Sequence, residues 1–259
     1  ARAEIHCSQN VIVRIETADG LYGTGEARPN PAVTGETQGT AIEAFKETAG
    51  LLIGRDALDI GARMTAINRA LAHNTALKSA VDMALYDLLG KAAGLPLYAI
   101  LGGGRRPVAT DNTVSLDEPS VMADKARQYR DEGFAAIKVK LGTTGPADVE
   151  RVRKIREAVG PDVTLRLDVN SGWDLPTAVS ALTAMAPLGI ELCEQPLPRW
   201  DISGMGRLRA KTSIPLMADE SIFSAHDAVA LIRAKACDYF NIKLAKSGGI
   251  RGALAIDAV

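Results

Sequence analysis

The chain has 259 residues, a hydrophobic fraction of 47% and a formal net charge of −1. This length fits one large α/β domain, or one such domain with a smaller cap, and the apolar fraction is enough for a sizeable core. Because the 31 acidic and 30 basic residues are interspersed, the charge predicts neither a nucleic-acid partner nor binding to an anionic membrane surface.

Cysteine usage and hydropathy indicate the cellular compartment. The cysteines are odd in number and far apart in the sequence, at positions Cys7, Cys193 and Cys237. This pattern argues against a disulfide framework and for a reducing compartment, so we expect a cytoplasmic protein. No apolar run approaches the ~20 residues of a membrane span, and no signal peptide is visible. The chain opens abruptly at Ala1–Ile5, and we expect its true N-terminus to be missing.

Residues 1–107 predict an α+β domain. The segment Asn10–Glu26 is typical of a β-hairpin, since two β-rich stretches flank a turn that contains glycine. The stretch Arg28–Thr37 holds two prolines and a glycine, which predicts a mobile loop. Apolar residues recur at three- and four-residue steps in Ala80–Leu89, which predicts a helix that stops at Gly94–Pro96.

Residues 108–259 show a different rhythm, in which short apolar strands alternate with amphipathic stretches. The expected strands are Ala109–Ser115, Ala135–Lys140, Thr164–Asn170, Ile190–Glu194, Leu216–Ala218 and Tyr239–Ile242. The expected helices include Pro119–Glu132, Ala147–Val159, Leu175–Pro187 and Ala225–Ala234. This alternation predicts parallel strands with crossover helices, in an open doubly wound sheet or a (β/α) barrel.

Charged residues at the strand ends favour the barrel. They terminate at least four different strands, whereas an open sheet gathers its site at one switch point. Six βα units do not close an eight-stranded barrel, and an open sheet edge would expose unpaired backbone groups. We therefore expect about two C-terminal units to be absent from this sequence.

Three carboxylates, Asp168, Glu194 and Asp219, end successive strands and are 26 and 25 residues apart. Strand ends in a barrel converge on one mouth, so these side chains predict a divalent-metal site. Oxygen ligands suit Mg²⁺ or Mn²⁺ better than Zn²⁺, and the three histidines are scattered. Asn170 and Glu220 adjoin the expected ligands and are candidates to support them. The alternative is that each strand-end acid only caps the helix that follows it.

Two lysines, Lys138 and Lys140, are two residues apart and therefore face the same side of a strand. Their repulsion should lower the pKa of at least one of them, and such a lysine can remove a proton near neutral pH. Lys243 ends a strand on the far side of the expected barrel. Two lysines on opposite faces of a substrate carbon could deprotonate it on one side and reprotonate it on the other. A metal would hold a substrate carboxylate and stabilise the enediolate.

Several motifs resemble those of one known group of enzymes. They are Ile137–Lys140, Arg166–Asn170, Glu194–Pro196, Ala218–Ser221 and Asn241–Gly249, together with Ala80–Asp87, Gly94–Tyr98 and Leu101–Gly103. The group is the enolase superfamily, in its muconate-lactonizing-enzyme subgroup. The resemblance implies an α+β capping domain at 1–107 and a modified (β/α)₇β TIM-like barrel, of which 108–259 would supply the first six βα units. It also implies a homo-oligomer, often an octamer.

The resemblance further implies a role for each polar residue of the motifs. Asp168, Glu194 and Asp219 correspond to the metal ligands. Lys140 and Lys243 correspond to the acid/base pair, Lys138 to the lysine that stabilises the enolate, and Glu220 to the group that supports Lys243. The loop Arg28–Thr37 corresponds to the loop that closes over the substrate. Known members of this superfamily use lysine or histidine bases with Mg²⁺.

Within the subgroup, the segments Val33–Thr37, Thr110–Ser115 and Asn241–Leu244 are similar to those of dipeptide epimerases of the L-Ala-D/L-Glu type. That similarity implies a dipeptide substrate, with Thr113 and Asn170 as contacts. Muconate cycloisomerase, N-acylamino-acid racemase, o-succinylbenzoate synthase and hydroxyproline-type dehydratase share the lysines and ligands and remain alternatives. A non-enzymatic binding protein is disfavoured, because none of the six ionisable residues is lost, and metal-dependent hydrolases usually add histidine ligands or a second metal.

Overall fold

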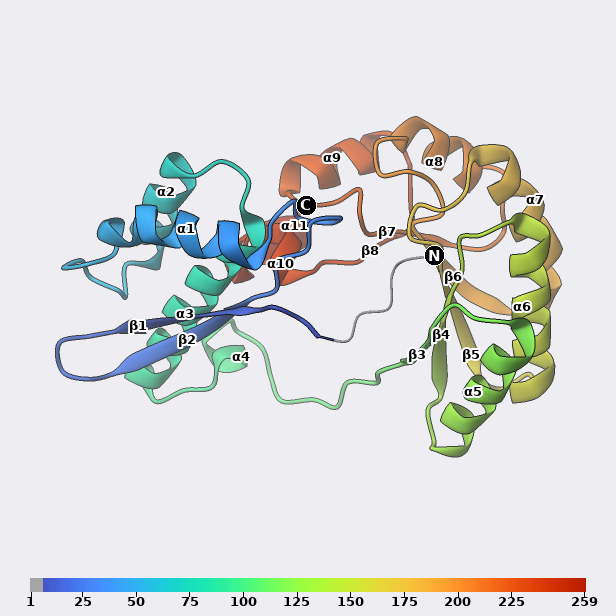
Figure 1. The fold of residues 1–259 in the computed structure, drawn as a ribbon, viewed down its shortest axis with the longest axis horizontal. Helices are drawn as coiled ribbons and strands as arrows, with labels where there is room; N and C mark the ends of the chain where they lie inside the picture. Colours follow the sequence, from blue (N-terminus) through green and yellow to red (C-terminus); the bar gives the residue numbers. More distant parts are fainter. Residues whose placement is uncertain (1–6) are drawn as a thin grey trace. The chain divides into compact units, whose positions relative to one another are not determined.

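The computed structural model describes residues 7–259, so the expected truncation at Ala1–Ile5 lies outside the described residues. The chain forms two compact units (Figure 1). In the described part of the chain, the first comprises Val108–Ile222 and His226–Asn241, and the second comprises residues 7–107, Phe223–Ala225 and Ile242–Val259. The predicted division into two domains at residue 107 stays a prediction.

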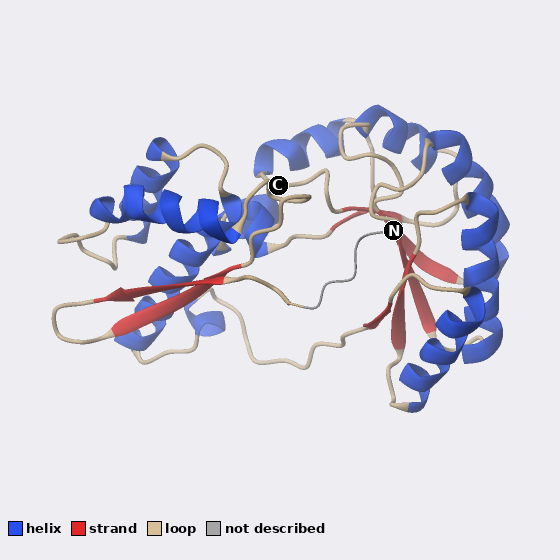
Figure 2. Ribbon diagram, in the orientation of Figure 1, coloured by secondary structure: helices blue, strands red, loops and turns tan. Residues whose placement is uncertain are grey.

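A parallel sheet forms the centre of the first unit, in the order β3-β4-β5-β6-β7-β8. Its strands are β3 (Asn112–Val114), β4 (Ala136–Lys140), β5 (Thr164–Asp168), β6 (Ile190–Glu194), β7 (Leu216–Ala218) and β8 (Tyr239–Phe240). The helices that connect them are α5 (Pro119–Asp131), α6 (Gly145–Val159), α7 (Leu175–Met185), α8 (Ile202–Arg209) and α9 (Ala225–Arg233), with a short 3₁₀ turn, η2 (Ala186–Leu188). Figure 2 shows the helices following one side of the sheet.

Apolar periodicity explains these elements. In β4 the buried residues are Ile137 and Val139, which alternate with the lysines, and α6 buries Val152 and Ile155 on one face. Helix α7 begins at a side-chain cap, because Asp174 accepts a hydrogen bond from the backbone N–H of Thr177 at 2.9 Å. The expected α/β alternation and parallel sheet are therefore confirmed.

Four of the six predicted strands are shorter in the structure, and the first and last of them bear on the site. The segment Ala109–Ser115 pairs only over Asn112–Val114, which lie beside residues 137–139 of β4. The last strand ends at Phe240, so Lys243 does not end a strand but begins helix α10 (Leu244–Ser247). The backbone leaves the ladder at Asn241, whose N–H makes a last bond to the carbonyl of Ala218 at 2.8 Å.

The second unit contains the predicted hairpin. It consists of β1 (Val11–Glu16) and β2 (Tyr22–Ala27), which pair antiparallel. Its helical elements are α1 (Gln38–Thr48), η1 (Ala49–Leu51), α2 (Ile60–Ala70), α3 (Thr75–Ala93), α4 (Leu97–Ile100), α10 and α11 (Ile250–Asp257). Helix α3 contains the helix predicted over Ala80–Leu89, and it ends as expected at Gly94, whose φ is +64°. Residues 28–37 form an irregular loop with a turn at Asn30, and the mobility of this loop stays a prediction.

Helices α3 and α11 are joined by a contact between residues far apart in the sequence. The carboxylate oxygen Oδ2 of Asp82 accepts hydrogen bonds from the backbone N–H groups of Ile250 and Arg251 at 2.6 and 3.2 Å. These groups belong to the first turn of α11, which has no side-chain cap of its own. Along residues 7–259, no helix is both long and apolar enough to cross a membrane.

Candidate active site

The parallel register aligns the expected site residues at one edge of the sheet. Lys140, Asp168 and Glu194 are the last residues of β4, β5 and β6, and each pairs with the next across the sheet. In the same row, Glu194 pairs with Met217 of β7, and Asp219 directly follows that strand. The sheet thus gathers these four predicted site residues from separate strands.

Lys138 lies between two of the carboxylates. Its ammonium Nζ is 2.8 Å from Asp168 Oδ2 and 2.6 Å from Glu194 Oε2. Burial opposes the charge of this ammonium, but the charges and hydrogen bonds of Asp168 and Glu194 outweigh that effect and raise the pKa of Lys138. The expected lowering therefore does not occur at Lys138, because the carboxylates of Asp168 and Glu194 face it.

Lys140 faces the same side as Lys138, as the i, i+2 spacing predicts. Its Nζ is 2.6 Å from Asp168 Oδ2 and donates to Asn170 Oδ1 at 2.8 Å. The amide of Asn170 donates in turn to Glu220 Oε1 at 3.0 Å. Asn170 adopts a left-handed backbone with a φ of +47°, a conformation that asparagine tolerates better than most residues. This chain of hydrogen bonds connects Glu220 to Lys140 through an amide that can orient both.

Burial makes it costly for the acidic residues of the site to carry their negative charges. Asp168, Glu194 and Asp219 are 0%, 3% and 2% exposed. Burial, followed by the charge of Asp168, raises the pKa of Glu194. Burial, followed by the charge of Asp219, likewise raises the pKa of Glu220. Because these carboxylates act on one another while largely removed from water, a nearby cation would stabilise their ionised forms.

The donor chemistry of this set fits a hard divalent cation. Asp168 and Glu194 converge on one position, which the ammonium of Lys138 occupies, and carboxylate oxygens are the ligands that Mg²⁺ prefers. Within residues 7–259, no group of three or more acidic, histidine or cysteine side chains already stands in the geometry of a metal centre. The assignment of Asp168, Glu194 and Asp219 as metal ligands stays a prediction.

The other predicted site residues have definite places. Thr113 of β3 pairs with Lys138 of β4 in the parallel register, so the two residues lie side by side. Lys243 is the N-terminal flanking residue of α10 and belongs to the second compact unit. Its role as a base opposite Lys140 stays a prediction.

Sequence reasoning missed the importance of Gln195, which is fully buried and has a φ of +38°. Its Oε1 accepts from the backbone N–H groups of Asp219 and Ser221 at 2.9 and 3.2 Å. Its Nε2 donates to Leu197 O and Ser221 Oγ at 3.0 and 2.8 Å. One side chain therefore fixes the backbone on both sides of Glu220. The only sequence signal was its position directly after Glu194.

Asn241 was also not assigned a role. Its Nδ2 donates to Glu194 Oε1 at 2.8 Å, while Lys138 bonds the other oxygen of the same carboxylate. Glu194 is thus held from two sides, so its orientation is set by the end of β8 as well as by β4. The signal that could have found Asn241 was its place at the end of a predicted strand, two residues before Lys243.

Comparison with known proteins agrees with this arrangement. Residues 121–259 match the family profile described as enolase C-terminal domain-like. Residues 1–102 match the N-terminal domain profile of mandelate racemase and muconate lactonizing enzyme. Together these matches cover most of the chain.

Individual relatives are close. The D-Ala-D/L-Ala epimerase of Cytophaga hutchinsonii is 46% identical over 250 residues, which cover 96% of this chain and 68% of that protein. The hydrophobic dipeptide epimerase of Enterococcus faecalis is 42% identical, with coverages of 100% and 73%. The L-Ala-D/L-Glu epimerase of Bacillus subtilis is 40% identical, with coverages of 98% and 71%.

A solved structure extends the comparison to three dimensions. The crystal structure of the Cytophaga hutchinsonii dipeptide epimerase, complexed with Mg and the dipeptide D-Ala-L-Val, superposes with a TM-score of 0.94. The match covers 96% of this chain and 68% of that one, at 46% sequence identity. Profiles, sequences and fold all agree, and the chain belongs to the mandelate racemase and muconate lactonizing enzyme family of the enolase superfamily.

Proposed function

We propose that this chain is an isomerase that epimerises dipeptides by Mg²⁺-dependent removal of a proton alpha to a carboxylate. The observation that carries the proposal is the row of Lys140, Asp168 and Glu194 at the ends of neighbouring strands, with Lys138 hydrogen-bonded between the carboxylates. The activities of the three relatives above, all of them epimerases, support a dipeptide substrate.

Each residue then has a chemical task. Mg²⁺, or Mn²⁺ in its place, would be held by Asp168, Glu194 and Asp219 and would supply electrophilic stabilisation of the substrate carboxylate. Lys140 removes the α-proton, and Lys243 returns a proton to the opposite face of the carbon. For this, Lys140 must give up its proton, and the hydrogen bond to Asn170 orients its amine.

The remaining polar groups serve charge and orientation. Lys138, whose ammonium lies between Asp168 and Glu194, donates to the negative charge that develops on the substrate enolate. Glu220 positions the acid/base groups through Asn170 and supports Lys243. Thr113, in register with Lys138, contacts the substrate.

The finer structural expectations form part of this proposal. The parallel sheet would belong to a modified (β/α)₇β barrel, and residues 7–107 to a cap whose loop at 28–37 closes over the substrate. The relatives act on different dipeptides, so a dipeptide screen is needed to find which side chain this protein prefers at the epimerised position. A homo-oligomer and a cytoplasmic location stay predictions.

Proton exchange in D₂O tests this proposal directly. The protein is incubated with Mg²⁺ and a panel that includes L-Ala-L-Glu, L-Ala-L-Ala and L-Leu-L-Tyr, and ¹H NMR follows the α-proton signals. We expect loss of one α-proton signal together with formation of the epimer. Peptide hydrolysis without exchange would contradict the proposal, and exchange restricted to muconate-type or N-acylamino-acid substrates would move the assignment to another activity of the family.

Lysine variants separate the two proton-transfer roles. Lys140→Ala and Lys243→Ala should each abolish epimerisation, and each should retain exchange with only one stereoisomer, because the remaining lysine still serves its own face. Lys154→Ala, which removes an exposed lysine of α6, is the matched control and should keep full activity. Full epimerase activity in either site variant would show that the two-base assignment is wrong.

A further inference from the structure

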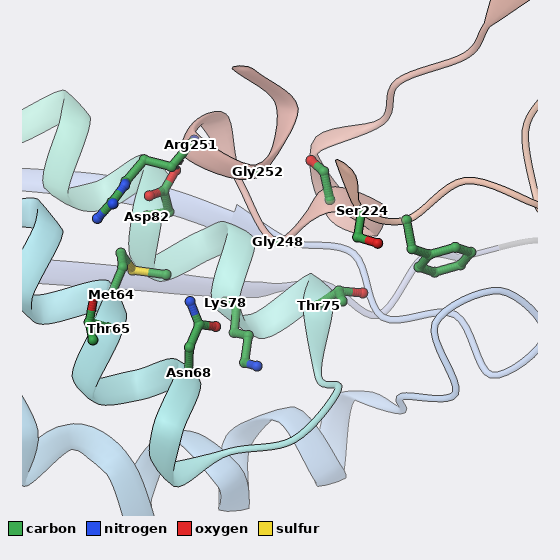
Figure 3. A pocket seen from close by; sticks show the side chains of 12 residues that line it. Met64, Thr65, Asn68, Thr75, Lys78, Asp82, Ser224, Gly248, Arg251 and Gly252 are labelled. Atoms are coloured by element: carbon green, nitrogen blue, oxygen red, sulfur yellow. Dashed lines mark hydrogen bonds between the residues drawn. The ribbon is translucent and has the colours of Figure 1, made fainter. Parts of the chain in front are cut away.

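The second unit contains a polar cavity that the proposed activity does not use. It has a volume of about 340 Å³ and lies among helices α2 and α3 and the segments around α10 and α11 (Figure 3). The residues on which the argument depends are Asn68, Thr75, Lys78, Asp82 and Arg251. All of them belong to the second compact unit.

Lys78 is the unusual member of this cavity. The residue is only 8% exposed, although lysine is almost never buried without a partner. In the described part of the chain, its side chain has neither a hydrogen bond nor an ion pair, and it lines the cavity. Burial lowers the pKa of Lys78, and the charge of Glu36 partly opposes that effect. An ammonium that is partly removed from water gains from a hydrogen-bond acceptor in its cavity.

Glu36 cannot be that acceptor in full, because both of its oxygens are already used. They accept from the backbone N–H groups of Ala76 and Leu77 at 2.9 and 3.0 Å. Glu36 thereby caps the N-terminus of α3, where a carboxylate is favoured by the helix dipole. Lys78, one residue further along the helix, is left facing the cavity.

Two other residues that can donate hydrogen bonds, Thr75 and Asn68, line the same cavity. The hydroxyl of Thr75 is buried and, among the described residues, has no hydrogen-bond partner. Thr75 precedes Lys78 by three residues and so lies on the same face of α3. Figure 3 shows the side chain of Asn68, from α2, beside that of Lys78. Figure 3 also shows the hydroxyl of Thr75 pointing away from Lys78, so the donors that can reach one small acceptor group together are the ammonium of Lys78 and the amide of Asn68.

We propose that Lys78 and Asn68 form a binding site for a small oxyanion, a phosphate or carboxylate group, inside the second unit. A charge-assisted hydrogen bond from an ammonium is stronger than a neutral one, and the amide of Asn68 adds a second donor to the anion. The cavity exceeds the ~30 Å³ that one water molecule occupies in the liquid, so it can admit a group of this size.

The other charged residues of the cavity do not cancel its preference for an anion. Asp82 uses its Oδ2 on the first turn of α11, and the charge of Arg251 acts on it, while its Oδ1 is buried and has no hydrogen-bond partner among the described residues. Lys78 and Arg251 therefore leave the cavity lining with one more cation than carboxylates.

An anion bound there would act on the stability of this unit. It would connect α2 to α3, since Asn68 and Lys78 belong to different helices. A ligand that binds only the folded state raises stability in proportion to its occupancy. The effect needs neither a dipeptide nor Mg²⁺, so the site can be tested separately from the proposed epimerisation.

Calorimetric titration of the whole chain with inorganic phosphate, and separately with acetate, tests the site. Both titrations are run at constant ionic strength against chloride. We expect saturable 1:1 binding of at least one oxyanion and a rise in the unfolding temperature with its concentration. Binding of phosphate but not acetate would show that the natural ligand carries a phosphate group. Binding of acetate but not phosphate would show that it carries a carboxylate group. Absence of saturable binding of either anion would overturn the proposal.

Variants locate the bound anion. Lys78→Met keeps the length of the side chain and should weaken binding by at least about 10-fold, because it removes the charged donor. Asn68→Leu should weaken it by a smaller factor, because it removes the neutral donor. Lys154→Met is the matched control for loss of a lysine charge on the surface. Unchanged affinity in Lys78→Met would refute the site.

A crystallographic soak keeps the test decisive even where Lys78→Met does not fold. The unchanged protein is soaked in selenate, an anomalous-scattering oxyanion. A selenium peak within hydrogen-bond distance of Lys78 Nζ is the expected result. Selenate bound only elsewhere on the protein would overturn the proposal.

Discussion

At the scale of single residues, Asp148 shows how one buried charge shapes the surroundings of Lys140. It is 0% exposed and accepts hydrogen bonds from the backbone N–H groups of Gly142 and Thr143 at 3.0 and 2.9 Å. It also accepts from the Thr143 hydroxyl, Arg151 Nη1 and Trp173 Nε1, each at 2.9 Å. The loop after β4 is thereby tied to α6 and to the loop after β5.

We predict that Asp148→Asn destabilises the protein by about 2–4 kcal/mol, because it leaves buried donors without a charged acceptor and breaks a buried ion pair with Arg151. Urea unfolding measures this change. Asp124→Asn is the matched control, since the Arg127–Asp124 pair is exposed on both sides, and it should change the stability by less than about 0.5 kcal/mol. Equal effects of the two substitutions would contradict the structural role given to Asp148.

The sequence predicted some of these residues and not others, for a physical reason. Lys140, Asp168 and Glu194 could be found because strand ends in a parallel sheet must lie in a row. Gln195 could not, since its partners are backbone amides in a loop that depends on its own φ of +38°. The raised pKa of Lys138 could not be predicted for a related reason: the period of a strand shows which residues share its face but not what faces them.

At the scale of elements, the contact of β2 with α3 depends on two glycines. A Cβ added at Gly25 would lie 2.0 Å from the carbonyl oxygen of Ala80, and one at Gly23 would lie 2.0 Å from that of Ala84. Both obstacles belong to the backbone of a long buried helix, so they cannot turn aside as a flexible side chain can. The absence of side chains at these positions is what lets the strand approach the helix.

We predict that Gly25→Ala destabilises the protein by about 3 kcal/mol or more, because the strand must move away from α3 and its buried apolar residues. Gly39→Ala in α1 is the control. The nearest atom to a Cβ there is 3.9 Å away, so this substitution should stabilise the protein by about 0.5–1 kcal/mol through the better helix propensity of alanine. Thermal unfolding of both variants checks the contrast, and a neutral Gly25→Ala would show that β2 and α3 are not packed this closely.

Element boundaries could be predicted where the apolar pattern changes sharply. The strands at Ile190–Glu194 and Leu216–Ala218 begin and end as predicted, because glycine or proline precedes each and charge ends it. The expected strand Tyr239–Ile242 is shorter, because the N–H of Asn241 makes the last bond of the ladder before α10 begins. Hydropathy alone does not reveal where the backbone leaves a ladder.

At the scale of the whole chain, contacts group segments that are far apart in sequence. Ile242–Val259 clusters with residues 7–107 in the second unit, and the bond between Asp82 and the N–H of Ile250 spans 168 positions. Apolar periodicity is a local signal, so it predicts α11 as a helix but not the capping carboxylate from α3. This long-range capping is invisible in the sequence because any buried acid could have supplied it.

Cation binding provides a test at this scale, because a ligand held by several strands stabilises the entire folded state. If Asp168, Glu194 and Asp219 bind Mg²⁺, adding it should raise the unfolding temperature of the chain in a saturable way. Asp219→Asn should weaken the Mg²⁺ affinity by about 10-fold or more, since one charged ligand is lost, and so shift this stabilisation to higher Mg²⁺ concentrations.

The exposed carboxylate of Asp124 again supplies the control for this experiment, and Asp124→Asn should leave the Mg²⁺ dependence as it is. Isothermal titration with Mg²⁺ gives the affinity independently of unfolding. An Asp219→Asn variant with unchanged Mg²⁺ affinity would remove this residue from the ligand set. The proton-exchange experiment would then show whether Glu220 is the third metal ligand or the site needs no third carboxylate. Only the loss of a ligand that takes part in the reaction should also abolish proton exchange.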